Sequence, residues 1–193
     1  MKKTVTLIEL IIAIILLAVI ILGAIAFDSA SRRMFRSSEE NAEILNDLTF
    51  ALEHIHKNVI MGIGDITAGD DRRAVNVTEE DGVFILTIWQ DTSTDARLVT
   101  TGSDADTQVT YVFNPTNSSV SIDGVVYEAH TINFEGDALL KNLMSIKVEE
   151  RDGGVAIDNF TLRTDPESAV DRSTNPEVSI EEQFFFPLSQ SLS

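Results

Sequence analysis

The first part of the chain is one long apolar run. Residues 10–27 contain no polar side chain and consist mainly of Ile, Leu and Ala. An α-helix rises about 1.5 Å per residue, so residues 7–27 in a helix would cover about 30 Å, the thickness of the hydrocarbon core of a bilayer. The pattern therefore predicts a helix that can span a membrane.

Glu9 is the only charged side chain within residues 7–27. A carboxylate inside a membrane helix is costly, and such a group usually has a partner. Alternatively, Glu9 lies at the level of the lipid headgroups, where it favours the positive end of the helix dipole. The residues by themselves leave both interpretations open.

The helix is predicted to continue beyond the apolar run, because no Pro or Gly occurs between Ala24 and Met61. A helix from Thr6 to Ile60 would be about 80 Å long. Its second half is amphipathic, and we expect its apolar stripe to pack under the C-terminal sheet, with Glu53, His54 and Lys57 on the solvated face. The residues of the expected stripe are Leu45, Leu48, Leu52, Ile55 and Val59. Gly62 and Gly64 are expected to end the helix.

The rest of the chain predicts an antiparallel β domain. Short runs rich in β-branched and aromatic residues alternate with turn signals, of which Asp123-Gly124 is the strongest. The expected strands are residues 83–89, 97–101, 108–113, 119–122, 125–134, 143–150 and 155–163. Residues 65–73 are predicted to be a polar connector and residues 165–177 a loop. Residues 184–186 are three phenylalanines that form either a strand folded back on the core or an exposed patch that docks a neighbouring subunit.

Charge and composition limit the classes of function that the chain can have. The formal net charge is -17, which argues against nucleic acid as a partner, since phosphate binding needs clustered cations. The chain has no cysteine, so disulfides and thiolate metal sites are excluded. Motifs of serine hydrolases, zinc proteases and phosphate-binding loops do not occur, and we expect no enzyme activity.

Two acidic loops are weak candidates for a Ca²⁺ site, because carboxylate oxygens are the ligands that Ca²⁺ prefers. Neither loop has the Gly and the terminal Glu of an EF-hand, and solvated acidic loops are the alternative. The candidate ligands are Asp65, Asp70, Asp71, Asp104 and Asp106.

The N-terminus resembles that of bacterial type IV prepilins and type II secretion pseudopilins. Met1-Lys2-Lys3 matches their short basic leader, and Thr6-Leu7-Ile8-Glu9-Leu10 matches the start of their mature chains. The resemblance implies that prepilin peptidase cleaves between Thr4 and Val5, although the family has Gly and usually Phe at these two positions. It also implies that Glu9 and Val5 act in subunit assembly, with Glu9 neutralising the N-terminal amine of a neighbouring subunit.

The order of the later strands resembles the larger minor pilins and the J-type minor pseudopilin. The implied fold class is α+β and pilin-like, with a long N-terminal α-helix packed on an antiparallel β-sheet ectodomain. The expected organisation is a leader (1–4), a transmembrane and polymerisation helix (5–28), an amphipathic helix (29–61) and an acidic β ectodomain (62–193).

We therefore expect a structural subunit, a minor one, of a type IV pilus-like or pseudopilus filament. The resemblance implies a single pass through the bacterial inner membrane with the ectodomain outside the cytoplasm, followed by assembly with other pilin or pseudopilin subunits. The positive-inside rule does not decide this orientation, because Lys2 and Lys3 precede the apolar run while Arg32, Arg33 and Arg36 follow it. One alternative is a membrane-anchored ectodomain that binds a ligand or partner without polymerising, and another is a secreted hydrolase behind a signal peptide.

Overall fold

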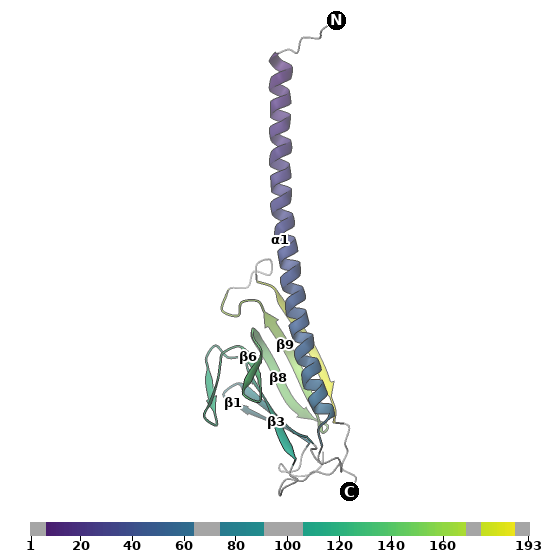
Figure 1. Ribbon diagram of the computed structural model, residues 1–193, viewed down its shortest axis with the longest axis vertical. Coiled ribbons are helices and arrows are strands. Elements are labelled where there is room, and N and C mark those ends of the chain that lie inside the picture. Colours follow the sequence, from purple (N-terminus) through teal and green to yellow (C-terminus); the bar gives the residue numbers. More distant parts are fainter. Residues whose placement is uncertain (1–6, 64–73, 91–105, 169–174, 188–193) are drawn as a thin grey trace. The chain divides into compact units, whose positions relative to one another are not determined.

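The computed structural model describes residues 7–63, 74–90, 106–168 and 175–187 of the chain. Its only helix in these residues is α1 (Leu7–Ile60), and antiparallel strands follow it (Figure 1). The chain divides into two compact units, Met1–Glu40 and Asn41–Ser193. The first unit therefore holds the apolar part of α1, and the second holds the end of α1 and the β-sheets.

Helix α1 is continuous from the first described residue, Leu7, and ends at Ile60, where the sequence predicts. Glu9 lies in its first turn and Lys57 in its last, so both charges match the helix dipole. At the C-terminal end the backbone nitrogen of Gly62 donates to the carbonyl oxygen of Val59 at 3.0 Å. A Cβ at position 62 would lie 2.9 Å from that same oxygen, so the close turn requires glycine. Gly64 lies outside the described residues.

Ten strands follow in the described residues, and every pairing between them is antiparallel. The strands form a five-stranded sheet of order β1-β2-β3-β6-β7, a three-stranded sheet of order β10-β9-β8 and the hairpin β4-β5. Their bounds are β1 (Val75–Glu80), β2 (Val83–Gln90), β3 (Thr107–Asn114), β4 (Val120–Ile122), β5 (Val125–Tyr127), β6 (Thr131–Phe134), β7 (Asp137–Leu140), β8 (Leu143–Arg151), β9 (Gly154–Arg163) and β10 (Glu177–Phe185). The fold class is α+β, as predicted.

The predicted strands at residues 83–89, 108–113, 119–122, 143–150 and 155–163 are confirmed within one residue or two at each end. The predicted strand at 125–134 is wrong as a single element, because it divides into β5 and β6. His130 stands between them with φ 55°, a left-handed conformation that interrupts the extended backbone. The predicted strand at 97–101 lies outside the described residues.

Strands β1 and β7 were not predicted, and of β10 only the end, within residues 184–186, was offered as a strand. The acidic end of β1 resembles a turn in sequence, but the turn itself is Asp81-Gly82, with φ 50° and 79°, while Glu79 and Glu80 still pair with β2. Sheet pairing overrides the low strand propensity of the acidic residues in such segments.

The buried face of α1 differs from the predicted stripe. Leu48, Ile55 and Val59 are buried as expected, but Leu45 is 51% exposed and Leu52 is only partly buried. The other buried apolar positions are Ile44 and Ala51. Alanine is small, so a prediction based on the spacing of large apolar residues does not place Ala51 on the buried face. The predicted stripe is therefore rotated around the helix, relative to the observed buried face, toward Leu45 and Leu52.

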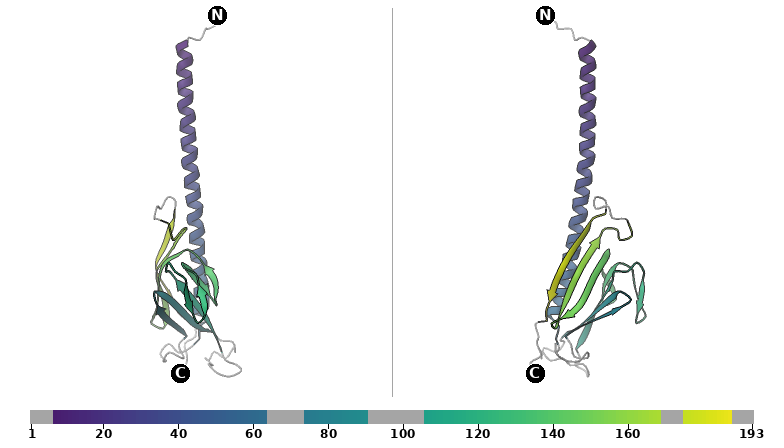
Figure 2. Two further views of the ribbon diagram at one scale, coloured as in Figure 1. Left: turned by 90° about the vertical axis from the view of Figure 1, so that its left-hand side faces the viewer. Right: turned by 180° about the vertical axis from the view of Figure 1, so that it is seen from behind.

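The main core joins the end of α1 to both larger sheets. Figure 2 shows β8, β9 and β10 alongside the C-terminal part of α1, and the core cluster contains Leu48 and Ile55 of α1 together with Phe160 of β9. A second cluster of Val83, Val112 and Tyr127 lies between the five-stranded sheet and the β4-β5 hairpin. Strand β2 is thus buried on both faces, as its sequence predicts.

The three phenylalanines lie at the end of β10 and directly after it, and the first predicted role, a strand folded back on the core, holds for Phe185. The docking of a neighbouring subunit stays a prediction. Phe185 belongs to the core and is 8% exposed, whereas Phe184 and Phe186 are 41% and 51% exposed. Alternation along a strand explains the difference, because neighbouring side chains point to opposite faces. The guanidinium of Arg151 lies 5.1 Å from the ring centre of Phe184.

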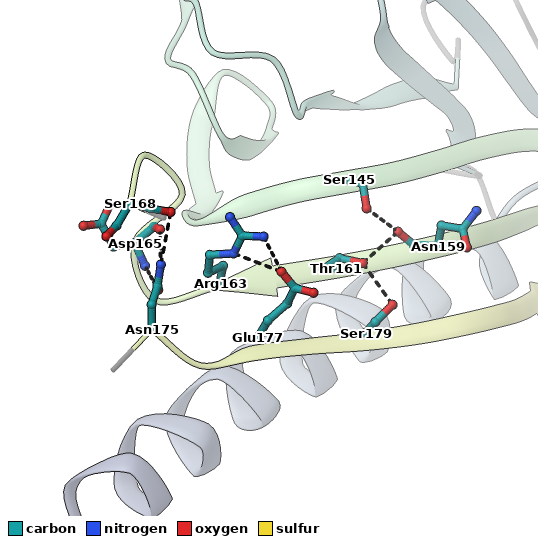
Figure 3. A network of polar contacts seen from close by, with 9 residues as sticks. All are labelled: Ser145, Asn159, Thr161, Arg163, Asp165, Ser168, Asn175, Glu177 and Ser179. Carbon is teal, nitrogen blue, oxygen red and sulfur yellow. Dashed lines mark hydrogen bonds and ion pairs between the residues drawn. The ribbon is translucent and has the colours of Figure 1, made fainter. Parts of the chain in front are cut away.

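The face of the three-stranded sheet that Figure 3 shows is held by polar pairs. The Arg163 Nε donates to a carboxylate oxygen of Glu177 at 2.9 Å, and the Thr161 hydroxyl donates to the Ser179 hydroxyl at 2.9 Å. Beyond these pairs the Asn175 side chain accepts from the Asp165 nitrogen at 2.9 Å and donates to the Asp165 carbonyl oxygen at 2.8 Å. These contacts add to the backbone pairing of β10 with β9.

Candidate membrane and assembly segment

The N-terminal part of α1 exposes its apolar side chains on all sides. Residues 7–30 are all exposed in the first unit, and this is the one helix in the described residues that is long and apolar enough to cross a membrane. The large exposed side chains include Leu7, Ile8, Leu10, Ile11, Ile14, Leu17, Ile20, Leu22, Ile25 and Phe27.

Such a surface is unfavourable in water. Burying one large apolar side chain is worth about 1.5–3 kcal/mol, and residues 7–27 carry many of them around the whole circumference of the helix. The helix therefore needs an apolar environment on every side, which either lipid or other apolar helices can supply.

Glu9 lies in the first turn of α1 with its side chain on the surface of the helix. At this position the carboxylate stabilises the positive end of the helix dipole, typically by about 0.3–1 kcal/mol. Thr4 and Val5, the predicted processing site, lie outside the described residues. The pairing of Glu9 with the amine of Val5 in another subunit therefore stays a prediction.

Ion pairs follow the apolar segment. Arg32 contacts the carboxylate of Asp28 at 2.8 Å, and Arg36 contacts that of Glu40 at 2.8 Å. Each pair joins residues four apart on one helix face, an arrangement worth about 0.3–0.5 kcal/mol in water. Charged side chains thus begin at Asp28, directly after the apolar run.

The Ca²⁺ candidates are only partly described. Asp65, Asp70, Asp71 and Asp104 lie outside the described residues, and Asp106 is buried directly before β3. Within the described ranges no group of three or more His, Asp or Glu side chains is placed to hold a metal ion. The calcium site stays a prediction.

A polar network in the second unit was not predicted. The Nδ1 atom of His54 lies 2.7 Å from the hydroxyl of Tyr111, to which the Asn58 side-chain nitrogen donates at 2.6 Å. The Gln90 side-chain nitrogen donates to the Asn58 side-chain oxygen at 2.7 Å. The network joins α1 to strands β2 and β3, and Tyr111 at its centre is fully buried. The prediction that His54 lies on the solvated face is wrong.

The hydrogen bonds assign the protons of the network. Because Asn58 donates to the Tyr111 oxygen, the hydroxyl proton is available to His54 Nδ1, which is nearer than the His54 carbonyl oxygen at 3.2 Å. With the hydroxyl proton assigned to Nδ1, His54 is neutral and protonated on Nε2. Burial and the nearby charge of Lys57 lower the pKa of His54, and burial raises the pKa of Tyr111. The network is therefore uncharged at neutral pH.

Comparisons of the chain with protein-family models, with curated proteins and with solved structures give no match.

The function is accordingly inferred from the residues of this chain. Its strongest feature is the apolar segment with an acid in the first turn, which the hydrophobic pattern alone reveals. The polar network had one signal in the sequence, since Asn58 falls on the same face of α1 as Ile55 and Val59. The spacing of His54 and Tyr111, 57 residues apart, gives no such signal.

Proposed function

We propose that this chain is a non-enzymatic structural subunit, a minor one, of a type IV pilus-like or type II secretion pseudopilus filament. Residues 5–28 hold it in the bacterial inner membrane before assembly, with the ectodomain outside the cytoplasm. One observation carries the proposal: α1 begins with a fully exposed apolar segment that has Glu9 in its first turn, and the same helix ends in the core of an antiparallel β domain.

The apolar segment serves twice in this proposal. In the membrane its side chains contact lipid, and in the filament the same side chains pack against the helices of neighbouring subunits. Both environments are apolar, so the exchange loses little of the free energy of burial. The free energy that favours the filament over the membrane then comes from packing and from polar contacts between helices.

Glu9 supplies such a polar contact. Its carboxylate pairs with the N-terminal amine of Val5 in a neighbouring subunit once prepilin peptidase has removed residues 1–4. Opposite unit charges about 4 Å apart attract by about 4 kcal/mol at an effective dielectric constant near 20. The pair also fixes the axial register of neighbouring helices, because only one stagger brings the two groups together.

Substitution of Glu9 in the native host tests the proposal. We expect Glu9→Ala to accumulate in the membrane fraction at the normal level but to be absent from sheared surface fibres or purified filaments. Glu39→Ala, which removes an exposed acid elsewhere on α1, should assemble normally. Normal assembly of Glu9→Ala would favour the alternative of an anchored ectodomain that binds a partner without polymerising.

The processing step has its own test. Mass spectrometry of the chain from native cells should find an N-terminus at methylated Val5. A chain that begins at Met1 in isolated filaments would contradict the cleavage between Thr4 and Val5.

A further inference from the structure

A basic stretch lies just beyond the apolar segment. Residues 32–36 combine three arginines with Met34 and Phe35, and we call these five residues the arginine collar. At about 1.5 Å per residue the collar stands about 8–14 Å along the helix axis from residue 27. The headgroup layer of a bilayer is about 5–8 Å thick on each side. Side chains on a helix lean toward its N-terminus, so long side chains of the collar reach back into that layer when residues 10–27 fill the hydrocarbon core.

Met34 and Phe35 are large apolar side chains in a polar stretch, and they are 75% and 73% exposed. Neither belongs to the apolar core of the second unit. The boundary between headgroups and acyl chains offers such side chains an environment less polar than water.

The three arginines differ in their partners. Arg32 and Arg36 are each paired with an acid one turn away, Asp28 and Glu40. Arg33 makes no ion pair with any residue that the structure describes. It is therefore the guanidinium of the collar that is available to an anion outside the chain, and a guanidinium matches the geometry of a phosphate group.

The arrangement around the helix favours lipid over a protein partner. Successive residues are about 100° apart, so the three arginines fall within about 100° of the circumference while Met34 and Phe35 lie on the opposite side. A second copy that docks on one side would cover only one of these two groups. A membrane surface surrounds the helix and contacts both.

We propose that the arginine collar docks in the headgroup layer of an anionic membrane, where Arg33 binds a lipid phosphate and Met34 and Phe35 enter the boundary with the acyl chains. This inference rests on the proposed membrane position of residues 5–28. It does not depend on filament assembly.

Photo-crosslinking in nanodiscs tests the proposal. The full chain carries benzoylphenylalanine in place of Phe35 and is inserted singly into discs of phosphatidylcholine and phosphatidylglycerol. Mass spectrometry then gives the ratio of the two lipids attached to the probe. One arginine near an anionic surface contributes about 1 kcal/mol, so we expect phosphatidylglycerol to be enriched about fivefold over its share of the disc.

The variants Arg33→Gln and Lys57→Gln complete the test. Arg33→Gln should bring the lipid ratio back to that of the disc, whereas Lys57→Gln, an exposed cation further along α1, should leave it unchanged. Equal lipid ratios in wild type and Arg33→Gln, or a probe that attaches to no lipid, would overturn the proposal. Because each disc holds one chain, the outcome is independent of the assembly test on Glu9.

Discussion

Removal of the Tyr111 hydroxyl tests the polar network that joins α1 to the five-stranded sheet. Tyr111→Phe keeps the buried ring but removes the hydrogen-bond partner of His54 Nδ1 and one acceptor of the Asn58 side-chain nitrogen. Asn58 retains its bond to the His54 carbonyl oxygen at 3.0 Å, and half-buried His54 can bind water instead. The loss is therefore that of one poorly replaced buried hydrogen bond.

The expected cost is about 2 kcal/mol, within the range of about 1–3 kcal/mol for a buried polar group left without its partner. For a unit of this size such a loss lowers Tm by about 4–8 °C. The measurement is thermal unfolding of the full chain in detergent, followed through the fluorescence of Trp89, the only tryptophan of the chain.

Tyr127→Phe is the matched control, because it is the only other tyrosine and no hydrogen bond of its hydroxyl is present in the described structure. We expect this variant to unfold within about 0.5 kcal/mol of wild type. Equal unfolding midpoints for the two variants would refute the reasoning, since the network would then contribute nothing that the ring alone does not supply.

Three further predictions concern the second unit. Folding lowers the pKa of His54, so the unfolded state binds more protons in acid, and the contribution of neutral His54 to stability is present above pH 6.5 and is lost as the pH falls below it. His54→Gln should therefore flatten the pH dependence of the urea unfolding midpoint over this range. A pH dependence equal to that of wild type would contradict the lowered pKa. Gly154→Ala would place a Cβ 2.5 Å from the carbonyl oxygen of Phe185, so we expect faster amide hydrogen exchange at the end of β10. Gly23→Ala is the control, because its Cβ would meet nothing within 4 Å. Leu48→Ala should destabilise the unit by about 2–5 kcal/mol, whereas Leu45→Ala should change its stability by less than about 0.5 kcal/mol. Similar losses of stability in the two variants would mean that Leu45 is buried, as the sequence predicts.

The hydrophobic pattern predicted the elements whose own residues have a clear helical or strand pattern. Helix α1 follows from a long sequence with no proline and only one glycine, Gly23, and β2 and β9 follow from runs of β-branched and aromatic residues. Most of β10 escaped prediction because its acidic residues resemble a loop, and the strand forms only by pairing with β9. The contact of Glu177 with Arg163 is an example of that pairing.

The features of the candidate site also differ in whether the sequence reveals them. The apolar segment and Glu9 are visible in the sequence because a membrane-length run needs no tertiary partner to be recognised. The network of His54, Asn58 and Tyr111 is not visible, because it forms only when α1 lies on β3. A polar residue on a buried helix face, here Asn58, is the one sign of such a network that the sequence offers.

In the proposed filament, α1 lies beside the helices of other subunits, with Glu9 next to a neighbour's N-terminal amine. Zero-length carbodiimide cross-linking of isolated filaments, followed by mass spectrometry, tests this contact directly. The account predicts an amide bond between the Glu9 carboxylate and the amino nitrogen of Val5 of another subunit. Recovery of the chain only as a monomer, with Glu9 open to water-soluble reagents in every preparation, would contradict it.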